Sequence, residues 1–338
     1  MSQARRAPAM SDVAAVAGVS HQTVSRVLNG HPSVRPETRQ RVQEAIVELG
    51  YRRNSAARAL VTRRSGALGV VTAGSSHYGP TSTLLGLEEA ARDVGYFVSV
   101  ATIRTMDAGS MRGALEHFLD QGVEGIVIIA PQAEVTAAVA TFDAPVPVVM
   151  ISAAAPGEEL GVRTVSIDQH EGARLATRHL IGLGHREVVH LAGPQDWFDA
   201  RARLTGWRAE CEAAGVVVPD PIAGDWTAER GYAVGRDMVA TGVPSAVFAA
   251  NDQLALGLLR AFWEAGVRVP RDVSVVGFDD VTGAAYFIPP LTTVRQDFAA
   301  LGRQAIGSLT AALSGAAFEQ PVIPATLVVR ASTAPPRP

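Results

Sequence analysis

The stretch SDVAAVAGVSHQTVSRVLNG, residues 11–30, decides the fold of the N-terminal region. Apolar residues recur at helical spacing before and after Gly18, which predicts two short helices over residues 11–17 and 21–28. Gly18 can adopt the left-handed conformation that ends a helix, and the Ser20 hydroxyl can cap the next one. A helix, a tight glycine turn and a capped second helix are the parts of a helix-turn-helix.

The second predicted helix has a polar outer face whose chemistry suits DNA. Gln can contact adenine through two hydrogen bonds and Arg can contact guanine in the same way, while Ser and Thr hydroxyls reach phosphates. Residues 1–64 carry eleven Arg against four acidic residues, a net +7, whereas residues 65–338 carry −10. A basic head on an acidic body indicates phosphate contact at one end only. We therefore predict DNA contacts from Ser20, His21, Gln22, Thr23, Ser25, Arg26 and Asn29.

A third helix is expected over about residues 36–49, with Pro36 in its first turn and an apolar stripe facing inward. It closes a three-helix domain, and Tyr51 packs onto it. A generic three-helix bundle without a DNA role is the alternative, but the turn, the polar face and the charge together favour DNA binding.

From residue 67 the pattern changes to short apolar runs separated by amphipathic stretches. Strands are expected at residues 68–71, 97–101, 125–130, 146–151, 188–192, 245–250 and 274–278. Helices are expected at residues 82–94, 111–121, 170–183, 200–214, 228–240 and 252–265. Two runs of β–α alternation indicate two doubly wound subdomains, whose ligand would bind beyond the carboxyl ends of the strands, in the cleft between them.

Residues 11–30 resemble the DNA-binding headpiece of the lactose-repressor family of bacterial regulators. Residues 37–60, ETRQRVQEAIVELGYRRNSAARAL, resemble its third helix and hinge. The resemblance implies that the hinge folds on operator DNA and inserts a Leu into the minor groove, which kinks the duplex. Arg35 stands where the family often has a capping Ser or Thr, so a weaker cap is expected. The predicted DNA-binding set gains Tyr51, Asn54, Ala57, Arg58 and Leu60, although Leu60 could be a buried linker residue.

The body resembles the periplasmic sugar-binding-protein fold that this family uses as its effector-sensing core. The resemblance is strongest in HLIGLGHREVVHLAGP (179–194), RARLTGW (201–207), residues 248–280 and PPLTTVRQDFAALG (289–302). It implies an α/β chain with a helix-turn-helix headpiece, a hinge helix and a core of doubly wound parallel sheets. The corresponding boundaries are 1–53, 54–64 and 65–338, with an N-subdomain of about 65–165 plus 292–322 and a C-subdomain of about 166–291 plus 323–332.

A sugar needs hydrogen-bonding groups at its edge and an aromatic ring on its apolar face. Arg201 offers a forked guanidinium, and Asn251 and Asp279 each follow an apolar strand. The resemblance makes these three the effector contacts and adds a stacking ring and two residues near the crossover: Trp226, Gln296 and Phe298. Other roles stay open, because Arg201 could be a surface residue, Asn251 and Asp279 helix caps, and Trp226 and Phe298 core residues.

The N-terminal side of the cleft departs from the family's galactoside-binding pattern. That pattern has an Asn and an Asp at two strand ends, where this chain has Ile129 and Ser152, and Thr83 replaces an aliphatic residue. Losing polar partners discriminates strongly between ligands. We therefore expect an effector other than a simple galactoside, with a less polar substituent on this side.

These observations predict a repressor of carbohydrate-utilisation genes that leaves a palindromic operator when a sugar binds the cleft. DNA binding needs two headpieces at a fixed spacing, and therefore a homodimer. The chain ends at residues 332–338 without a leucine heptad, so a dimer rather than a tetramer is expected. A purine- or nucleoside-responsive co-repressed regulator is the alternative within the family, and a sugar-binding transport protein is the alternative outside it.

Several classes are disfavoured by what the sequence does not contain. There is no run of 18 apolar residues and no apolar stretch after the two N-terminal arginines, so a cytoplasmic protein is expected rather than a membrane or secreted one. Cys211 is the only cysteine. The sequence has no nucleophile–base pair, metal-ligand cluster or phosphate loop, so neither an enzyme nor a cofactor or metal is expected.

Overall fold

This computed structural model describes residues 8–51, 64–73, 77–104, 107–129, 132–153, 163–318 and 322–337. The chain divides into two compact units, Met1–Ser65 and Gly66–Pro338. The predicted hinge contacts Asn54, Ala57, Arg58 and Leu60 lie outside the described residues. Within the described ranges, no helix is both long and apolar enough to cross a membrane.

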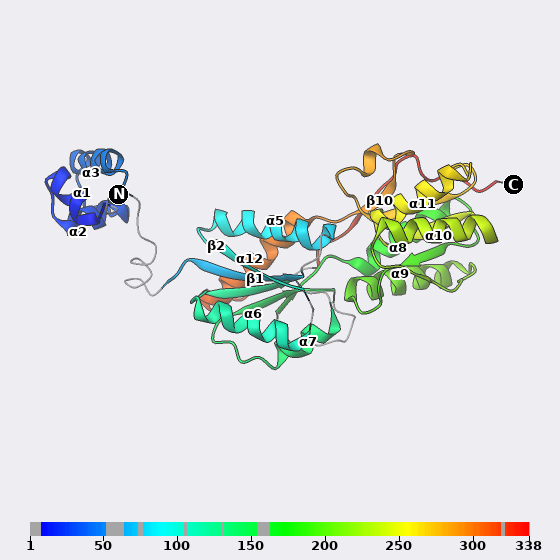
Figure 1. Ribbon diagram of the computed structural model, residues 1–338, viewed down its shortest axis with the longest axis horizontal. Helices are drawn as coiled ribbons and strands as arrows, with labels where there is room; N and C mark the ends of the chain where they lie inside the picture. Colours follow the sequence, from blue (N-terminus) through cyan, green and yellow to red (C-terminus); the bar gives the residue numbers. More distant parts are fainter. Residues whose placement is uncertain are drawn as a thin grey trace, which may run out of the picture. The chain divides into compact units, whose positions relative to one another are not determined.

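The first unit holds helices α1 (Met10–Ala17), α2 (His21–Leu28) and α3 (Pro36–Leu49) (Figure 1). Gly18 ends α1 in the left-handed conformation, with φ 61°. The Ser20 hydroxyl then caps α2 by accepting from the Thr23 N–H at 3.2 Å. The N-cap residue of α3, Arg35, makes no side-chain capping hydrogen bond, in agreement with the weaker cap expected there. The predicted helix–turn–helix and its third helix are therefore confirmed.

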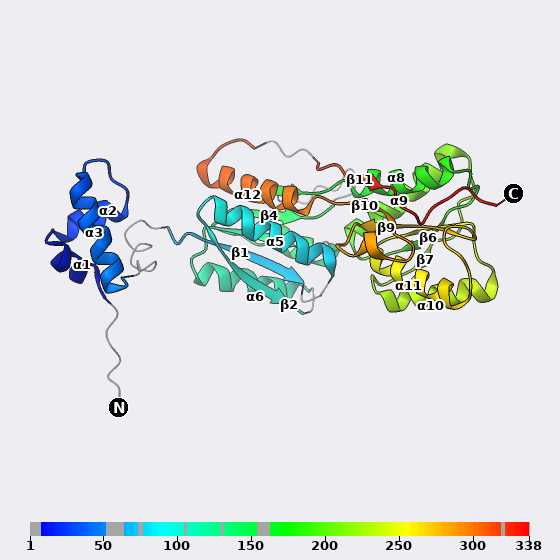
Figure 2. The same cartoon turned by 90° about the horizontal axis from the view of Figure 1, so that it is seen from above.

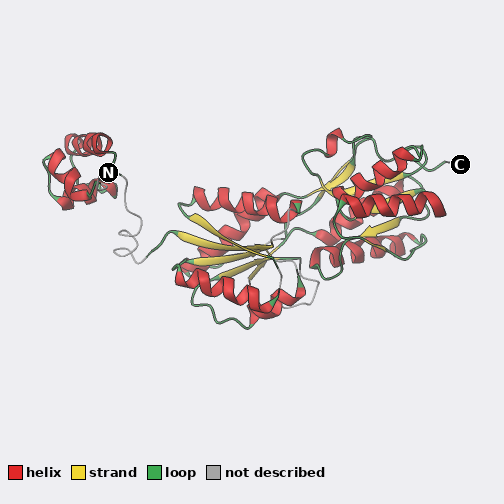
Figure 3. Cartoon of the chain, viewed as in Figure 1, coloured by secondary structure: helices red, strands yellow, loops and turns green. Residues whose placement is uncertain are grey.

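The first sheet of the second unit is parallel, in the order β2-β1-β3-β4-β5. Its strands are β1 (Ala67–Ala73), β2 (Phe97–Ile103), β3 (Gly125–Ile129), β4 (Val148–Ile151) and β5 (Arg163–Val165). Leu68 and Val70 face one layer of helices, and Ala67 and Val71 face the other. The first layer is α5 (Tyr78–Asp93) with α12 (Phe298–Ser314), and the second is α6 (Ala108–Asp120) with α7 (Ala133–Ala140) (Figures 1 and 3).

Helices α5 and α12 approach each other closely because glycines meet at their crossing (Figure 2). A Cβ at Gly86 would lie 2.6 Å from the Phe298 carbonyl oxygen, and one at Gly302 would lie 2.3 Å from the Gly86 carbonyl carbon. These positions bring Phe298, the first residue of α12, next to the start of α5.

The second sheet has the order β11-β10-β9-β8-β6-β7 and is parallel except for β11. Its strands are β6 (Val189–Ala192), β7 (Ile222–Ala223), β8 (Ala246–Ala249), β9 (Ser274–Asp279), β10 (Thr292–Arg295) and β11 (Thr326–Val328). Phe248 packs toward the layer of α8 (Gln169–Gly182) and α9 (Phe198–Ala214). Val247 packs toward the layer of α10 (Ala228–Thr241) and α11 (Asp252–Glu264).

One subdomain boundary differs from the sequence prediction, which placed residues 292–295 in the N-subdomain. They form β10, whose Thr292–Arg295 pairs in parallel with Val276–Asp279 of β9. The side chains of Thr292 and Val294 are fully buried in the second sheet. The chain therefore returns to the first subdomain only after Arg295, with Gln296 and Asp297 as the connection to α12.

Candidate functional site

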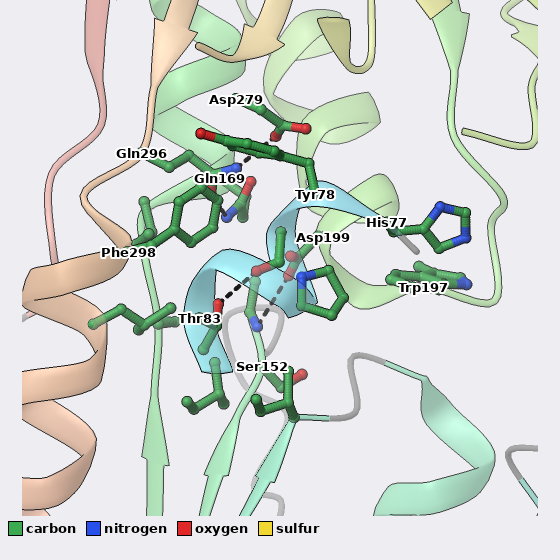
Figure 4. Close-up of a pocket in the computed structure, with 18 of the residues that line it drawn as sticks. His77, Tyr78, Thr83, Ser152, Gln169, Trp197, Asp199, Asp279, Gln296 and Phe298 are labelled. Carbon is green, nitrogen blue, oxygen red and sulfur yellow. Dashed lines mark hydrogen bonds between the residues drawn. The ribbon is translucent and has the colours of Figure 1, made fainter. Parts of the chain in front are cut away.

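A cavity of about 670 Å³, counting the part open to solvent, lies between the two subdomains of the second unit (Figure 4). Polar and apolar residues at the carboxyl ends of strands from both sheets line it, as expected for doubly wound sheets. Most of the predicted effector-binding residues meet there: Thr83, Ile129, Ser152, Trp226, Asn251, Asp279, Gln296 and Phe298.

The remaining prediction, Arg201, is corrected by the geometry of α9. Arg201 does not line the cavity, and its guanidinium lies over the Phe198 ring, 4.5 Å from the centroid. Arg203 lines the cavity instead, together with Asp199. Residues four apart share one face of a helix, whereas a residue midway between them points to the other side. Because Arg stands at both positions 201 and 203, the sequence alone does not show which of the two faces the cavity.

The Arg203 guanidinium is committed to protein partners. Its Nε donates to the Gln169 amide oxygen at 2.9 Å, Nη1 donates to the Ala250 carbonyl, and Nη2 lies 3.5 Å from Asp279 Oδ1. The guanidinium also lies over the Phe278 ring, 3.9 Å from its centroid. Such a planar fork, bonded through Nε and both terminal nitrogens, orients its neighbours with little freedom of its own.

Asp279 stands at the end of β9 with φ 111°, a left-handed value that turns the chain at the cavity wall. Its Oδ1 accepts from the Gln296 amide nitrogen at 2.7 Å, and the Gln296 oxygen accepts from Gln169 at 2.6 Å. Burial raises the pKa of Asp279 to about 6, while Arg203 opposes the rise. Among the described residues no hydrogen bond uses Oδ2, so this oxygen is available to a ligand hydroxyl.

Asn251 and Trp226 are tied together at the second sheet. Asn251 caps α11 by accepting from the Leu254 N–H at 2.8 Å, so its alternative role as a helix cap is confirmed. Its amide nitrogen donates to the Trp226 carbonyl at 3.1 Å. Trp226 has φ 73°, and its ring packs on Gly193, where a Cβ would lie 2.2 Å from it. The absent side chain at Gly193 therefore leaves room for the indole at the cavity wall.

The N-terminal side of the cavity is less apolar than its sequence predicted. The Thr83 hydroxyl donates to the Gly79 carbonyl of its own helix at 2.8 Å. The Ser152 hydroxyl is buried and has no hydrogen-bond partner in the described part of the chain. Asp199, which sequence reasoning missed, accepts from the Ala153 N–H at 3.3 Å. A carboxylate from α9 thus reaches the end of β4, next to Ser152.

Asp199 is desolvated at this place. Burial raises its pKa, and Arg203 and the Ala153 N–H oppose the rise. Asp199 could have been predicted from its position four residues before Arg203 on the same helix, which places both side chains on one face. Two further lining residues, His77 and Trp197, come from loops after β1 and β6 and carried no pattern in the sequence.

In the first unit, the predicted DNA-contacting residues lie along α2 and its cap. The side chains of His21, Gln22 and Arg26 are exposed, as the polar outer face predicted. The remaining members are partly or fully exposed: Ser20, Thr23, Ser25 and Asn29. Tyr51, by contrast, is 9% exposed and belongs to the core of this unit.

Comparison with known proteins covers both units. Residues 9–54 match the family described as bacterial regulatory proteins, lacI family, and residues 177–333 match a periplasmic binding protein-like domain. The lactose operon repressor of Escherichia coli K12 is 35% identical over 331 residues, which cover 96% of this chain and 90% of the repressor. The chain belongs to the lacI family. The HTH-type transcriptional regulator CelR of Thermobifida fusca is 36% identical over 349 residues, covering 97% and 99%.

Solved structures of lacI-family members agree with this fold. The lac repressor dimer bound to operator and the anti-inducer ONPF has a TM-score of 0.87 at 33% identity, covering 97% of this chain and 100% of that one. The complex of the regulator CelR with cellobiose has a TM-score of 0.72 at 33% identity, covering 96% and 99%. The predicted family and fold class are confirmed, and this lacI-family chain is a transcription regulator with an N-terminal helix-turn-helix.

Proposed function

We propose that this protein represses carbohydrate-utilisation genes and leaves its operator when a neutral sugar or glycoside fills the cavity between its subdomains. It acts by binding, not by catalysis, and works on DNA as a homodimer in the bacterial cytoplasm. Two headpieces at a fixed spacing match a palindromic operator. Relatives support this reading, since one was solved as a dimer on operator DNA and another with cellobiose.

The observation that carries the choice of effector is the balance of charge in the cavity. Asp199 and Asp279 are the carboxylates of its wall, and Arg203 is already bonded within the protein. Burial lowers the pKa of His77, so its imidazole is neutral near pH 7. The one permanent cation among the described lining residues, Arg203, is thus already paired with Asp279. Carboxylate oxygens accept from sugar hydroxyls, which favours an uncharged polyol.

The cavity also explains how a ligand would shift the protein between two states. Ile129 and Ser152 come from the first sheet, whereas Asn251 and Asp279 come from the second, so one ligand contacts both subdomains. A ligand that contacts both favours the arrangement in which its contacts are made. If that arrangement holds the operator less well, operator DNA must weaken ligand binding by the same factor. Induction, not co-repression, is the sense of response that we propose.

The experiment is operator binding measured by fluorescence anisotropy, with an operator obtained by in vitro selection from random duplexes. Neutral sugars, their phosphorylated forms and purine bases are added in turn. We expect at least one neutral sugar to weaken operator binding tenfold or more, while phosphorylated sugars do not. Tighter operator binding with guanine or hypoxanthine would instead support the co-repressed alternative.

A further inference from the structure

The turn that follows β9 holds the chain in a strained conformation. Asp279 and Asp280 both have positive φ angles, 111° and 52°. Residues other than glycine keep such angles only where the surrounding structure compensates the strain. Because Asp279 is one of the carboxylates that line the cavity, whatever holds this turn also decides where a ligand meets that carboxylate.

The left-handed conformation turns the Asp279 side chain toward the cavity. In a regular strand, side chains alternate between the two faces, so Asp279 would lie on the face of Gly277. That face packs on α11, because a Cβ at Gly277 would lie 2.2 Å from Oδ1 of Asp252 in this helix. Asp279 Oδ1 instead accepts from Gln296 (Figure 4) and lies 3.5 Å from Arg203 of α9. The geometry of the turn therefore directs Asp279 to the cavity.

Asp252 lies on the α11 side of this turn, with a fully buried side chain. Its Oδ2 accepts from the Val281 N–H at 2.8 Å, and its Oδ1 lies 2.5 Å from the hydroxyl oxygen of Thr293 in β10. Val281 directly follows the two left-handed residues, so the first bond fixes the exit of the turn. The second bond ties the same carboxyl group to the neighbouring strand. One side chain thus joins α11, the turn and β10.

An acidic residue in the first turn of a helix often serves only that helix, through its dipole. Asp252 is the first residue of α11, but Asn251 already caps this helix by accepting from the Leu254 N–H at 2.8 Å. The two Asp252 bonds given above lead away from α11, to Val281 and Thr293. These contacts favour a role at the turn over a role in the helix.

The protonation of Asp252 suits this role. Burial raises the pKa of Asp252 to about 8, and the nearby Asp279 adds to the rise. Near pH 7 the carboxyl group is therefore protonated, and it can donate to Thr293 while it accepts from Val281. A neutral group also spares Asp279 the repulsion of a second buried carboxylate. An Asn side chain has the same shape and offers one donor and one acceptor in the same places, so Asp252→Asn should keep both bonds.

Building on the carbohydrate response proposed above, we propose that Asp252 is a positioning residue for effector binding, whose carboxyl group holds the turn after β9 so that Asp279 meets the ligand. Asp252 is not among the described residues that line the cavity, so it acts through Asp279 and not by touching the ligand. Loss of its two hydrogen bonds should let the turn relax and withdraw the Asp279 carboxyl group from its bond with Gln296.

Isothermal titration calorimetry on the full chain tests this role with named sugars. Glucose, galactose, ribose, cellobiose, lactose and maltose are titrated into the wild type, and the tightest binder is then used with every variant. We expect Asp252→Ala to weaken its binding about twentyfold or more, whereas Asp252→Asn should stay within about threefold of the wild type at pH 7.

Ser274→Ala is the matched control. Ser274 is fully buried at the other end of β9, and its hydroxyl donates to the Ala334 carbonyl at 3.0 Å. This variant also loses a buried hydrogen bond of the same strand, but it leaves the turn at Asp279 alone. Its sugar affinity should stay within about twofold of the wild type.

Crystal structures of the variants without sugar show the positioning directly. With Asp252→Asn, Asp279 should keep its positive φ and its hydrogen bond with Gln296. With Asp252→Ala, we expect that hydrogen bond to be lost, and an unchanged Asp279 would overturn the proposal. If Asp252→Ala does not fold, Asp252→Leu replaces it, because Leu fills the buried space without making either hydrogen bond.

The outcomes separate this role from the carbohydrate response itself. Unchanged sugar affinity in Asp252→Ala, or an equal loss in Asp252→Asn or in Ser274→Ala, would overturn the positioning role and leave the carbohydrate response standing. Binding of no sugar would overturn the carbohydrate response, and the crystal structures would then decide by themselves whether Asp252 positions Asp279.

Discussion

Arg203 and Asp279 form a buried ion pair at the cavity wall, with 3.5 Å between Nη2 and Oδ1 and side chains 5% and 8% exposed. The pair joins α9 to the end of β9. Removing two charges from water costs about as much as their attraction returns, so such a pair adds little net stability. Its role here is positional, because Arg203 also holds Gln169, which bonds Gln296, and Gln296 bonds Asp279 in turn.

Replacing Arg203 should therefore be far more disruptive than replacing Arg201. Arg203→Met leaves the Asp279 carboxylate buried without its cation, which should lower the free energy of unfolding by about 3 kcal/mol and abolish sugar binding. Arg201→Met loses a stacking contact outside the cavity, and its cost should stay below about 1 kcal/mol. Urea unfolding followed by tryptophan fluorescence reports on this unit, because it holds every Trp of the chain: Trp197, Trp207, Trp226 and Trp263. Equal losses in the two variants would contradict the assignment.

The stability of this unit should depend on pH through Asp252. Burial raises the pKa of Asp252 from 3.8 to about 8, and the nearby Asp279 adds to the rise. An acid whose pKa is raised by folding binds its proton more tightly when folded, so stability falls as pH rises from about 4 to about 8. The penalty is complete above that range.

Asp252→Asn should remove this dependence. The Asp252 carboxylate accepts from the Val281 N–H at 2.8 Å and from the Thr293 hydroxyl at 2.5 Å. An Asn amide can accept the first bond and donate to the Thr293 oxygen, as a protonated carboxyl would. Between pH 6 and pH 9 the variant should gain about 1–3 kcal/mol on the wild type, measured as the difference between urea-unfolding free energies. A difference that stays constant with pH would show that Asp252 is not the group responsible.

The fold could be predicted from the sequence where a local pattern was sufficient. The glycine turn at Gly18 and the cap at Ser20 need only their neighbours in the chain, so the helix-turn-helix was predictable. The buried apolar strands of the core were predictable for the same reason. β10 was placed in the wrong subdomain because its assignment depends on pairing with β9, and no local signal records which sheet a short strand joins.

The same distinction between local pattern and long-range packing applies to the residues of the site. Asn251 and Asp279 were predictable, because a polar residue directly after an apolar strand must lie at the carboxyl edge of the sheet. The choice between Arg201 and Arg203 depends on the rotation of α9 about its axis, which the sequence shows only once a second inward residue, Asp199, is recognised. The contact of Asp199 with Ala153 crosses the cleft, so it depends on how the two subdomains meet.

In the headpiece, His21 should affect which operator is chosen. It is exposed at the first position of α2, where side chains reach base edges in a helix-turn-helix. His21→Ala should change the ranking of operator sequences, with shifts of about 1–3 kcal/mol at one base position. Selection from a random duplex library, followed by anisotropy on the winning sequences, measures the change.

Ser20→Ala provides the non-selective comparison. It removes the hydroxyl that accepts from the Thr23 N–H, a loss of about 1 kcal/mol in helix stability. Because the cap supports the whole of α2, every operator should be weakened by a similar factor and the ranking kept. If His21→Ala also left the ranking unchanged, the specificity role given to His21 would be wrong.

This part of the cleft should accept a carboxylate at position 152 in place of the one at position 199, but not at both positions together. Ser152 stands at the end of β4 with a buried, unpartnered hydroxyl in the described part of the chain, and Asp199 bonds the next residue, Ala153. Ser152→Asp would bring a second carboxylate into the same desolvated space, where two like charges repel. This change alone should cost about 2–3 kcal/mol of stability at pH 7.5. Asp199→Ser alone should cost much less, since it removes a desolvated charge.

The double variant, Ser152→Asp with Asp199→Ser, should be more stable than the sum of the single changes. It restores one carboxylate to the space, now carried by β4 in place of α9. The coupling free energy should exceed about 1 kcal/mol, because the penalty in Ser152→Asp comes from the second charge. Urea unfolding of the wild type and the three variants at one pH gives this coupling directly. Additive losses would mean that the two side chains do not share a site, and the placement of Asp199 beside Ser152 would have to be abandoned.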